Sequence, residues 1–198
     1  MQAVVYVHGF QGSPQSAKAR QLGAALARDL PAVRYEVPLL SFEPRAAVRA
    51  VERALDALAA DGCESPVLVG SSMGGFYAVH VAARRGLRAV LVNPAVSPHE
   101  LFRDRLGPVE NPWTGERHLL CEADLTALQE LDVPVPPRPS DLLVLLQTGD
   151  ETLDWRLAWE RYSDCQLVRL HGGNHAFAHF EDCFGLLYRF AGLAPAQA

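Results

Sequence analysis

The stretch "VGSSMGGF" at residues 69–76 decides the fold. It overlaps the end of a branched apolar run, "SPVLVG" at 65–70, and "GGFYAVHVAA" at 74–83 continues with the pattern of a helix. A strand, a sharp turn and a helix in direct succession form a nucleophile elbow, and GxSxG is centred on Ser72. Glycines on both sides let the strand and helix approach closely while the serine adopts a strained backbone conformation. We therefore predict that Ser72 is a nucleophile.

Two other interpretations of the adjacent serines remain open. Ser71 or Ser72 could cap the following helix, a common role for serine, although a cap does not need flanking glycines. A phosphate-binding loop is the second alternative. The chain has no GxxxxGK[ST] pattern, and no lysine follows these glycines, so this alternative has little support.

Outward from this stretch, short apolar runs alternate with longer amphipathic segments, which is typical of βαβ units and a parallel sheet. The sequence predicts an α/β fold of three layers, with a mostly parallel sheet of about six strands between two layers of helices. Strands are expected at 3–7, 33–37, 66–70, 88–93, 142–147 and 165–170, and helices at 15–29, 45–60, 74–84, 154–162 and 177–191.

The length of 198 residues is that of one domain, which we expect to span residues 1–198. An insertion at 94–140, after the fourth expected strand, holds eight of the fourteen prolines and one clear helical pattern, "EADLTALQEL" at 122–131. Long connections inside a compact domain are commonly functional or disordered. A packed crossover and a small lid over an active site both remain open for this insertion.

The composition excludes several classes of protein. Hydrophobic residues make up 49% and charged residues 21%, which is ordinary globular usage and excludes a disordered or fibrous chain. The net charge of -5 and the scattered basic residues give no electrostatic footprint for nucleic acid. We expect a small-molecule partner, while the oligomeric state is left undetermined.

Membrane and metal sites are also unexpected. The beginning "MQAVVYVHGF" has the pattern of a strand, and no window approaches the roughly 18 consecutive apolar residues of a spanning helix. We therefore expect no membrane partner and a cytoplasmic location. The four cysteines are widely spaced and form no CxxC pair, so neither a metal site nor a disulfide framework is predicted.

A serine nucleophile needs a base, most often histidine, and "LHGGNHAFAHF" at 170–180 offers three histidines. His175 follows the last expected strand and a Gly-Gly-Asn turn, which would deliver it to the carboxyl edge of the sheet. His171 ends the strand itself, and His179 lies one helical turn beyond His175. We predict His175 as the base and the other two as surface or packing residues.

The base in turn needs a carboxylate to orient it. "LLVLLQTGDETLDW" at 142–155 places Asp150 a short turn after a nearly continuous apolar run. Asp154 is the second choice, because it would equally serve as the N-cap of the next helix, and Glu151 is expected to face solvent. Ser72, Asp150 and His175 thus follow successive strands in the chain order serine, acid, histidine.

Two backbone N–H groups are expected to stabilise a developing oxyanion. One belongs to Met73, directly after the nucleophile, and the other to Phe10 in the loop "VYVHGFQGS" at 5–13. His8 in that loop suits a structural hydrogen bond better than catalysis. Among the aromatic residues, we select Phe76 and Trp113 as expected substrate contacts.

Several motifs together resemble the small single-domain α/β-hydrolases, and more closely the YqiA-like esterases. The resemblance covers almost the whole chain and implies cofactor-independent hydrolysis of carboxylic esters, with short-chain acyl esters or acyl thioesters as substrates. It also implies that Ser72, Asp150 and His175 occupy the positions of the family's nucleophile, acid and base. The motifs are "VVYVHGFQGSPQSAKA" at 4–19, "VGSSMGGFYA" at 69–78, "NPWTGE" at 111–116, "LLVLLQTGDETLDW" at 142–155 and "GGNHAFAHFE" at 172–181.

The first hypothesis is therefore a serine esterase that works through an acyl-serine intermediate and needs no metal or other cofactor. An acyl-CoA thioesterase or a peptidase would use the same three side chains on a different activated carbonyl. A different class of protein, a catalytically silent member of the fold that binds a partner through residues 94–140, is the remaining alternative.

Overall fold

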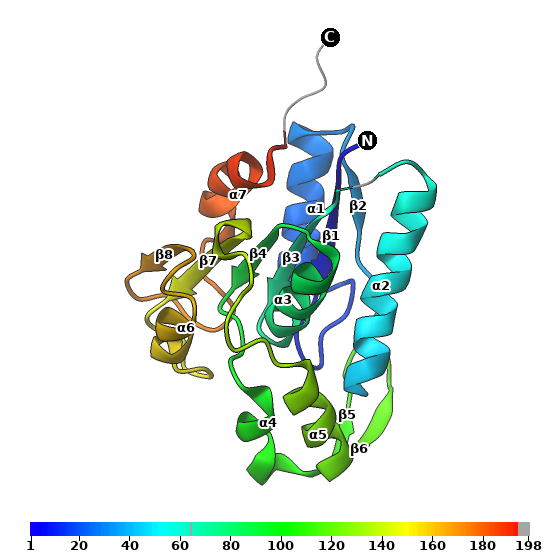
Figure 1. Cartoon of the computed structure of the whole chain (residues 1–198), viewed down its shortest axis with the longest axis vertical. Helices are drawn as coiled ribbons and strands as arrows, with labels where there is room; N and C mark the ends of the chain where they lie inside the picture. The colour runs from blue at the N-terminus through cyan, green and yellow to red at the C-terminus, as the bar shows by residue number, and fades with distance from the viewer. Residues whose placement is uncertain (64, 194–198) are drawn as a thin grey trace.

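The computed structural model describes residues 1–63 and 65–193, and the other positions of the predicted 1–198 domain lie outside the described residues. A six-stranded sheet lies at its centre, in the strand order β2-β1-β3-β4-β7-β8 (Figure 1). Every neighbouring pair of strands in this sheet is parallel, as the sequence predicted. The strands are β1 (Ala3–Val7), β2 (Arg34–Glu36), β3 (Val67–Ser71), β4 (Ala89–Val92), β7 (Leu142–Gln147) and β8 (Gln166–Leu170).

Helices cover both faces of this sheet (Figure 1). Val4 and Tyr6 of β1 belong to a core cluster with residues of the helices on one face, and Val5 and Val7 belong to a second cluster with residues of the helices on the other face. The alternation follows from the two-residue period of a strand. The first face carries α1 (Ala17–Asp29) and α7 (Phe184–Ala191), and the second carries α2 (Pro44–Ala60), α3 (Met73–Arg85) and α6 (Trp155–Arg161).

The four central strands are buried along their whole length, whereas the edge strands β2 and β8 are partly exposed. A parallel strand that is covered on both faces reads as a continuous apolar run, which explains "AVVYV" and "LLVLLQ". The three-layer α/β architecture predicted from these runs is confirmed.

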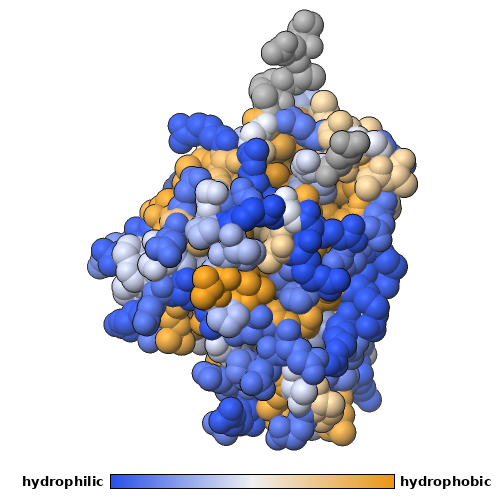
Figure 2. Space-filling view, in the orientation of Figure 1, coloured by the Kyte–Doolittle hydropathy of each residue, from blue (hydrophilic) through white to orange (hydrophobic). Residues whose placement is uncertain are grey.

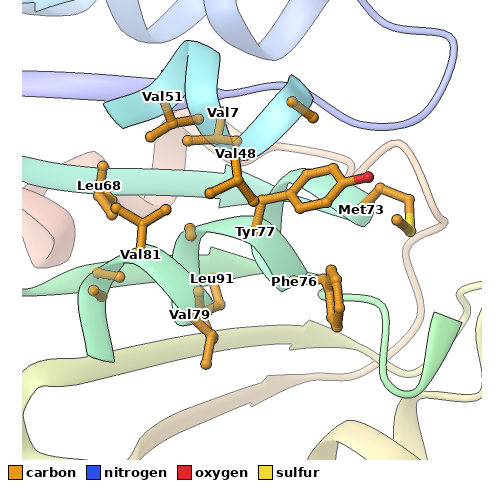
Figure 3. Packing of buried hydrophobic residues seen from close by; sticks show 14 of the residues in the cluster. Val7, Val48, Val51, Leu68, Met73, Phe76, Tyr77, Val79, Val81 and Leu91 are labelled. Atoms are coloured by element: carbon orange, nitrogen blue, oxygen red, sulfur yellow. The ribbon is translucent and has the colours of Figure 1, made fainter. Parts of the chain in front are cut away.

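The apolar positions that the sequence predicted for the helices face the core. In α1 the buried residues are Ala19, Leu22, Ala25 and Leu26, at helical spacing. On the other face, Figure 3 shows Val48 and Val51 of α2 beside Tyr77 of α3, with valine and leucine side chains packed around them. These contacts hold α3, and therefore the turn before it, firmly against the sheet.

One predicted helix begins later than expected. Residues 177–179 of the expected helix 177–191 are not helical, and a 3-10 turn, η3 (Phe180–Cys183), precedes α7. Phe177 and His179 have φ angles of 61° and 58°, in the left-handed region, which interrupts a right-handed helix. Neither residue is glycine, so the sequence carried no local signal that the helix would be interrupted here.

The insertion 94–140 contains several short elements, and its helices and hairpin gather beyond the carboxyl end of the sheet before the chain returns to the start of β7 (Figure 1). The helix expected at 122–131 is confirmed as α5 (Glu122–Leu131). The sequence analysis missed an antiparallel hairpin and a short helix before it. These are β5 (Gly107–Glu110), β6 (Arg117–Leu120) and α4 (Pro98–Leu101), and the connection to β7 ends in a short 3-10 turn, η2 (Pro139–Asp141).

Hydrophilic residues cover most of the surface in the view of Figure 2, around a hydrophobic patch at its centre. Within residues 1–63 and 65–193, no helix has the length and apolar character needed to cross a bilayer.

Candidate active site

The turn between β3 and α3 presents Ser72 at the carboxyl end of the sheet. Ser72 has φ 55° and ψ −124°, a conformation that a non-glycine residue adopts only at a cost in free energy. Its N–H donates to the Val92 carbonyl over 3.1 Å, and its carbonyl accepts from the amides of Gly75 and Ala95. Among the described residues, its hydroxyl makes no capping hydrogen bond to α3, so a capping role for Ser72 is not supported.

Glycines on either side of Ser72 are required by close backbone contacts. A Cβ atom at Gly74 would overlap with the carbonyl oxygen of Val7 and lie 2.6 Å from that of His8, and one at Gly70 would overlap with the carbonyl oxygen of Gly74. The start of α3 therefore lies directly against the end of β1. This contact brings the loop after β1 next to Ser72.

The histidine predicted as the base reaches this serine from a distant segment. His175 lies in the loop after β8, and its Nε2 atom is 3.1 Å from Ser72 Oγ. Gly172 and Gly173 both have φ of 75°, so they supply the turn that brings the loop back over the sheet. Two residues that are 103 positions apart in the chain are thus in direct contact.

The second ring nitrogen of His175 contacts Asp150. His175 Nδ1 lies 2.8 Å from Oδ2 and 3.0 Å from Oδ1 of this carboxylate, whose side chain is 1% exposed. Asp150 Oδ1 also accepts the amides of Thr152 and Leu153, at 2.9 and 2.8 Å. A carboxylate only accepts hydrogen bonds, so Nδ1 carries the proton and Nε2 is left to accept the Ser72 hydroxyl.

The electrostatic surroundings keep Asp150 ionised. Burial acts to raise the pKa of this carboxyl group, but the hydrogen bonds from His175, Leu153 and Thr152 outweigh burial and hold the pKa below its usual value. A carboxylate that is ionised at neutral pH is the partner that an imidazole needs when it gains a proton.

The rival acids and histidines have other positions. Glu151 accepts the backbone N–H of His175 over 2.9 Å, which lowers the pKa of this exposed carboxyl group. Asp154 caps α6 by accepting the amide of Arg156 over 3.0 Å. His171 is exposed and directly precedes the Gly-Gly turn, and His179 borders the cleft described below.

His8 is buried in the loop after β1 and acts as a structural link. Its Nε2 accepts the amide of Leu40 over 3.1 Å, which leaves Nδ1 to donate to the carbonyl of Gly9 over 3.0 Å. The amide of Gly12 donates to the same carbonyl of Gly9 over 3.0 Å and closes a tight turn. Burial lowers the pKa of His8, so the imidazole is held in its neutral form.

That turn carries Phe10, one of the two residues predicted to donate a backbone N–H to an oxyanion. The Phe10 ring packs against Phe42 and Phe102, with centroid distances of 4.9 and 4.7 Å, which fixes the position of its backbone. Met73, the other predicted donor, is the first residue of α3, so its amide has no acceptor within the helix.

A cleft of about 500 Å³ opens over Ser72 and His175. Trp113, predicted to contact substrate, is among the residues that line this cleft, and it is 58% exposed. Phe76, the other predicted contact, is only 4% exposed and packs in the core beside Tyr77 (Figure 3). It is not among the residues that line the cleft, so the prediction for Phe76 is not supported.

The sequence analysis missed a buried amide network that holds the His175 loop. The side chain of Gln147, at the end of β7, accepts the amides of Asn174 and Ala178 over 3.0 Å each and donates to the carbonyl of Ala178 over 2.7 Å. Asn93, at the end of β4, accepts the amide of Gln147 and donates to the carbonyl of Asn174. The sequence did contain a signal for this network, because Gln147 and Asn93 are polar residues at the ends of the apolar strands β7 and β4.

Lys18 was also missed. Its ammonium donates to the carbonyl of Ala176 over 2.9 Å, and its side chain lines the cleft. The contact joins the start of α1 to the residue after His175, across 158 positions of sequence. No local pattern in the sequence indicates such a contact.

Several solved structures have the same architecture. The structure of Est1E from Butyrivibrio proteoclasticus with ferulic acid bound has a TM-score of 0.73 at 14% identity, with 94% of this chain and 86% of that chain covered. Alpha/beta hydrolase domain-containing protein 10 from mouse has a TM-score of 0.72 at 14% identity, with 96% and 88% covered. The esterase domain of a Rhodothermus marinus protein has a TM-score of 0.63 at 18% identity, with 95% and 86% covered.

These likenesses establish the α/β-hydrolase fold. A family model matches residues 3–192, nearly the whole chain, which agrees with the family resemblance indicated by the sequence motifs. The chain belongs to the family described as Uncharacterised protein family (UPF0227).

Proposed function

We propose that this protein is a serine hydrolase that cleaves carboxylic esters with short acyl groups through an acyl-serine intermediate. Ser72 is the nucleophile, His175 the general base and acid, and Asp150 the carboxylate that orients the imidazole. The observation that carries the proposal is the continuous contact from Ser72 Oγ to His175 Nε2 and from His175 Nδ1 to Asp150, at 3.1 and 2.8 Å.

In the first half of the reaction, Ser72 Oγ attacks the carbonyl carbon of the ester while its proton passes to His175 Nε2. Negative charge then develops on the former carbonyl oxygen, and the amides of Phe10 and Met73 donate hydrogen bonds to it. Asp150 stabilises the imidazolium without taking its proton. When the intermediate collapses, His175 gives the proton to the leaving alcohol and the acyl group remains on Ser72.

In the second half, water takes the place of the alcohol. His175 accepts a proton from water as the water oxygen attacks the acyl-serine, and it returns that proton to Ser72 Oγ when the acid leaves. Each proton that His175 accepts is returned within the cycle, so the proposed reaction requires no external oxidant or cofactor. Trp113 at the border of the cleft is the proposed aromatic contact for the substrate.

The space behind the proposed oxyanion donors favours a short acyl group. A cavity of only about 20 Å³ is lined by Phe10 and Met73 together with residues that include Leu40, Phe42 and Tyr77. The described residues therefore leave little room for a long acyl chain at this position. The cleft itself presents glutamine, serine, lysine and histidine side chains as well as apolar ones, which is unlike the largely apolar lining that a fatty-acyl chain requires.

A fluorophosphonate probe tests the mechanism directly, because it reacts with an activated serine. We expect the label on Ser72, and we expect Ser72→Ala to abolish both labelling and turnover of p-nitrophenyl butyrate. Ser71→Ala is the matched control: Ser71 is the adjacent serine and is buried at the end of β3. Labelling at Ser71, or turnover that persists in Ser72→Ala, would refute the proposal.

The same experiment separates the remaining alternatives. A catalytically silent binding protein would neither react with the probe nor turn over any activated ester. A thioesterase or peptidase would react with the probe but prefer an acyl thioester or an amide in a comparison of kcat/KM. The cytoplasmic location predicted from the sequence is checked by fractionation of cells that express the protein.

A further inference from the structure

Lysine occurs once in this chain. Of the 18 lysine and arginine residues, Lys18 is the single lysine, and the other basic positions are arginine. It is the second residue of α1 and it lines the cleft that contains Ser72 and His175. An ammonium is a compact point charge that binds anions without the planar geometry that a guanidinium imposes.

The Lys18 ammonium lies close to the proposed catalytic residues. Its hydrogen bond to the carbonyl of Ala176 places it one residue from His175 along the loop. Burial lowers the pKa of Lys18, and the negative charge of Asp150 opposes this shift, which agrees with an ammonium near the buried carboxylate. The position is therefore within reach of a substrate whose carbonyl is held at Ser72.

This ammonium has unused donors. A protonated lysine offers three N–H donors, and the contact with Ala176 uses one of them. In residues 1–63 and 65–193, Lys18 forms no ion pair, whereas the partly buried Arg161 is paired with Asp132. Glu181 also lines the cleft, but it is an exposed residue, so its charge is screened by solvent.

We infer that Lys18 binds a negatively charged group of the substrate, so that the preferred ester or thioester carries an anionic substituent such as a carboxylate or a phosphate. The inference rests on the proposed function, because the anion is placed relative to a carbonyl bound at Ser72. A half-buried cation that forms no ion pair within the described residues, and whose desolvation the charge of Asp150 offsets only in part, pays for burial in the free protein, and an anionic substrate offsets the remaining cost when it binds. Charge-assisted hydrogen bonds then select this substrate over a neutral analogue of the same size.

Two matched pairs of substrates test the inference and locate the anion. Monophenyl adipate and phenyl hexanoate differ by a carboxylate in place of a methyl group at the end of the acyl chain. S-butyryl-4'-phosphopantetheine and S-butyryl-pantetheine differ only in whether the leaving group carries a phosphate. For each pair, the ratio of kcat/KM for the charged substrate to that for the neutral one is measured at low ionic strength.

The variants separate charge from loop position. Lys18→Gln keeps an N–H donor but removes the charge, Lys18→Arg keeps the charge, and Arg20→Gln removes a charge from an exposed position on the same helix. We expect the ratio for one pair to fall about tenfold in Lys18→Gln, the size expected when one hydrogen bond to a charged group is lost. Lys18→Arg should retain most of the ratio, and Arg20→Gln should match the wild-type protein.

Because a ratio is used, an effect of the lost Ala176 contact on both members of a pair cancels. Ratios that are the same in the wild-type protein and in Lys18→Gln for both pairs would overturn the inference while leaving the hydrolase proposal intact. If none of the four substrates is turned over and the fluorophosphonate probe does not label Ser72, the proposed function fails, and this inference fails with it.

Discussion

The Oε1 atom of Gln147 lies 3.0 Å from the amide nitrogen of Asn174, the residue immediately before His175. The same oxygen accepts the amide of Ala178, so one buried side chain holds both ends of the short segment that carries the proposed base. The position of His175 relative to Ser72 therefore depends on Gln147. Within the described residues, the side chain of Gln147 forms no hydrogen bond with either of these two residues.

Replacement of Gln147 by methionine keeps the volume of the side chain and removes its hydrogen bonds. We expect Gln147→Met to lower kcat for p-nitrophenyl butyrate roughly 10- to 100-fold, because a small displacement of the base misaligns proton transfer. KM should change little, because the cleft that binds the substrate is left in place. Gln166→Met, an exposed glutamine on the neighbouring strand, is the control and should behave like the wild-type protein. Equal losses in both variants would contradict a positioning role for Gln147.

Asp150→Asn tests the assignment of the acid. An asparagine at this position removes the negative charge and can present an N–H to the imidazole, which favours the wrong tautomer of His175. We expect kcat to fall by on the order of 10³-fold or more. Asp154→Asn should retain full activity, because Asp154 caps α6 and asparagine also caps helices well. If Asp154→Asn were the inactive variant and Asp150→Asn the active one, the acid would have been assigned to the wrong residue.

Gly74→Ala tests the close approach of α3 to β1. The added methyl group would overlap with the carbonyl oxygen of Val7, so the backbone would have to shift. We expect the free energy of unfolding to fall by about 2 kcal/mol, as for other overpacked sites. Gly185→Ala is the matched control, because an added Cβ there meets no described atom within 4 Å apart from its chain neighbours and the nearby backbone of its own helix, α7. The higher helix propensity of alanine should make that variant slightly more stable in urea denaturation. A stable Gly74→Ala variant would argue against the described packing.

His8 should make stability depend on pH. Burial lowers the pKa of this imidazole in the folded protein below the ordinary value of 6.5, so the unfolded chain binds the proton more readily. The free energy of unfolding should therefore be highest above pH 6.5 and fall as the pH drops below that value towards the lower pKa of the folded state. In His8→Gln this dependence should be weaker between pH 7 and pH 5, measured by urea denaturation at several pH values. His171→Gln, at an exposed histidine, should keep the wild-type dependence. Parallel curves for the wild-type protein and His8→Gln would rule out this role of His8.

The features that the sequence predicted well follow from its local patterns. The buried parallel strands appear as apolar runs, and each predicted triad residue lies a few positions after the end of such a run. Because the carboxyl ends of parallel strands meet at one edge of the sheet, segments near 72, 150 and 175 were expected to meet there. The contact distances between these side chains were not predictable, because they depend on loop geometry.

The missed features depend on contacts or conformations without a local signature. The hairpin of β5 and β6 shows little apolar alternation, although Asn111 and Gly115 in its turn were available signals. Phe76 was selected as a substrate contact from among the aromatic residues, but its side chain is buried in the core. Lys18 is conspicuous in the sequence as the single lysine, yet only the folded chain brings it to Ala176.

The side chain of Asn111 donates to the carbonyl of Gly12 over 2.9 Å and thereby ties the hairpin that bears Trp113 to the turn that bears Phe10. Substrate range and reaction rate are consequently coupled in the proposed enzyme. Substitutions that reshape the hairpin to accommodate a bulkier acyl group would also displace the amide of Phe10, unless Asn111 and its hydrogen bond are preserved.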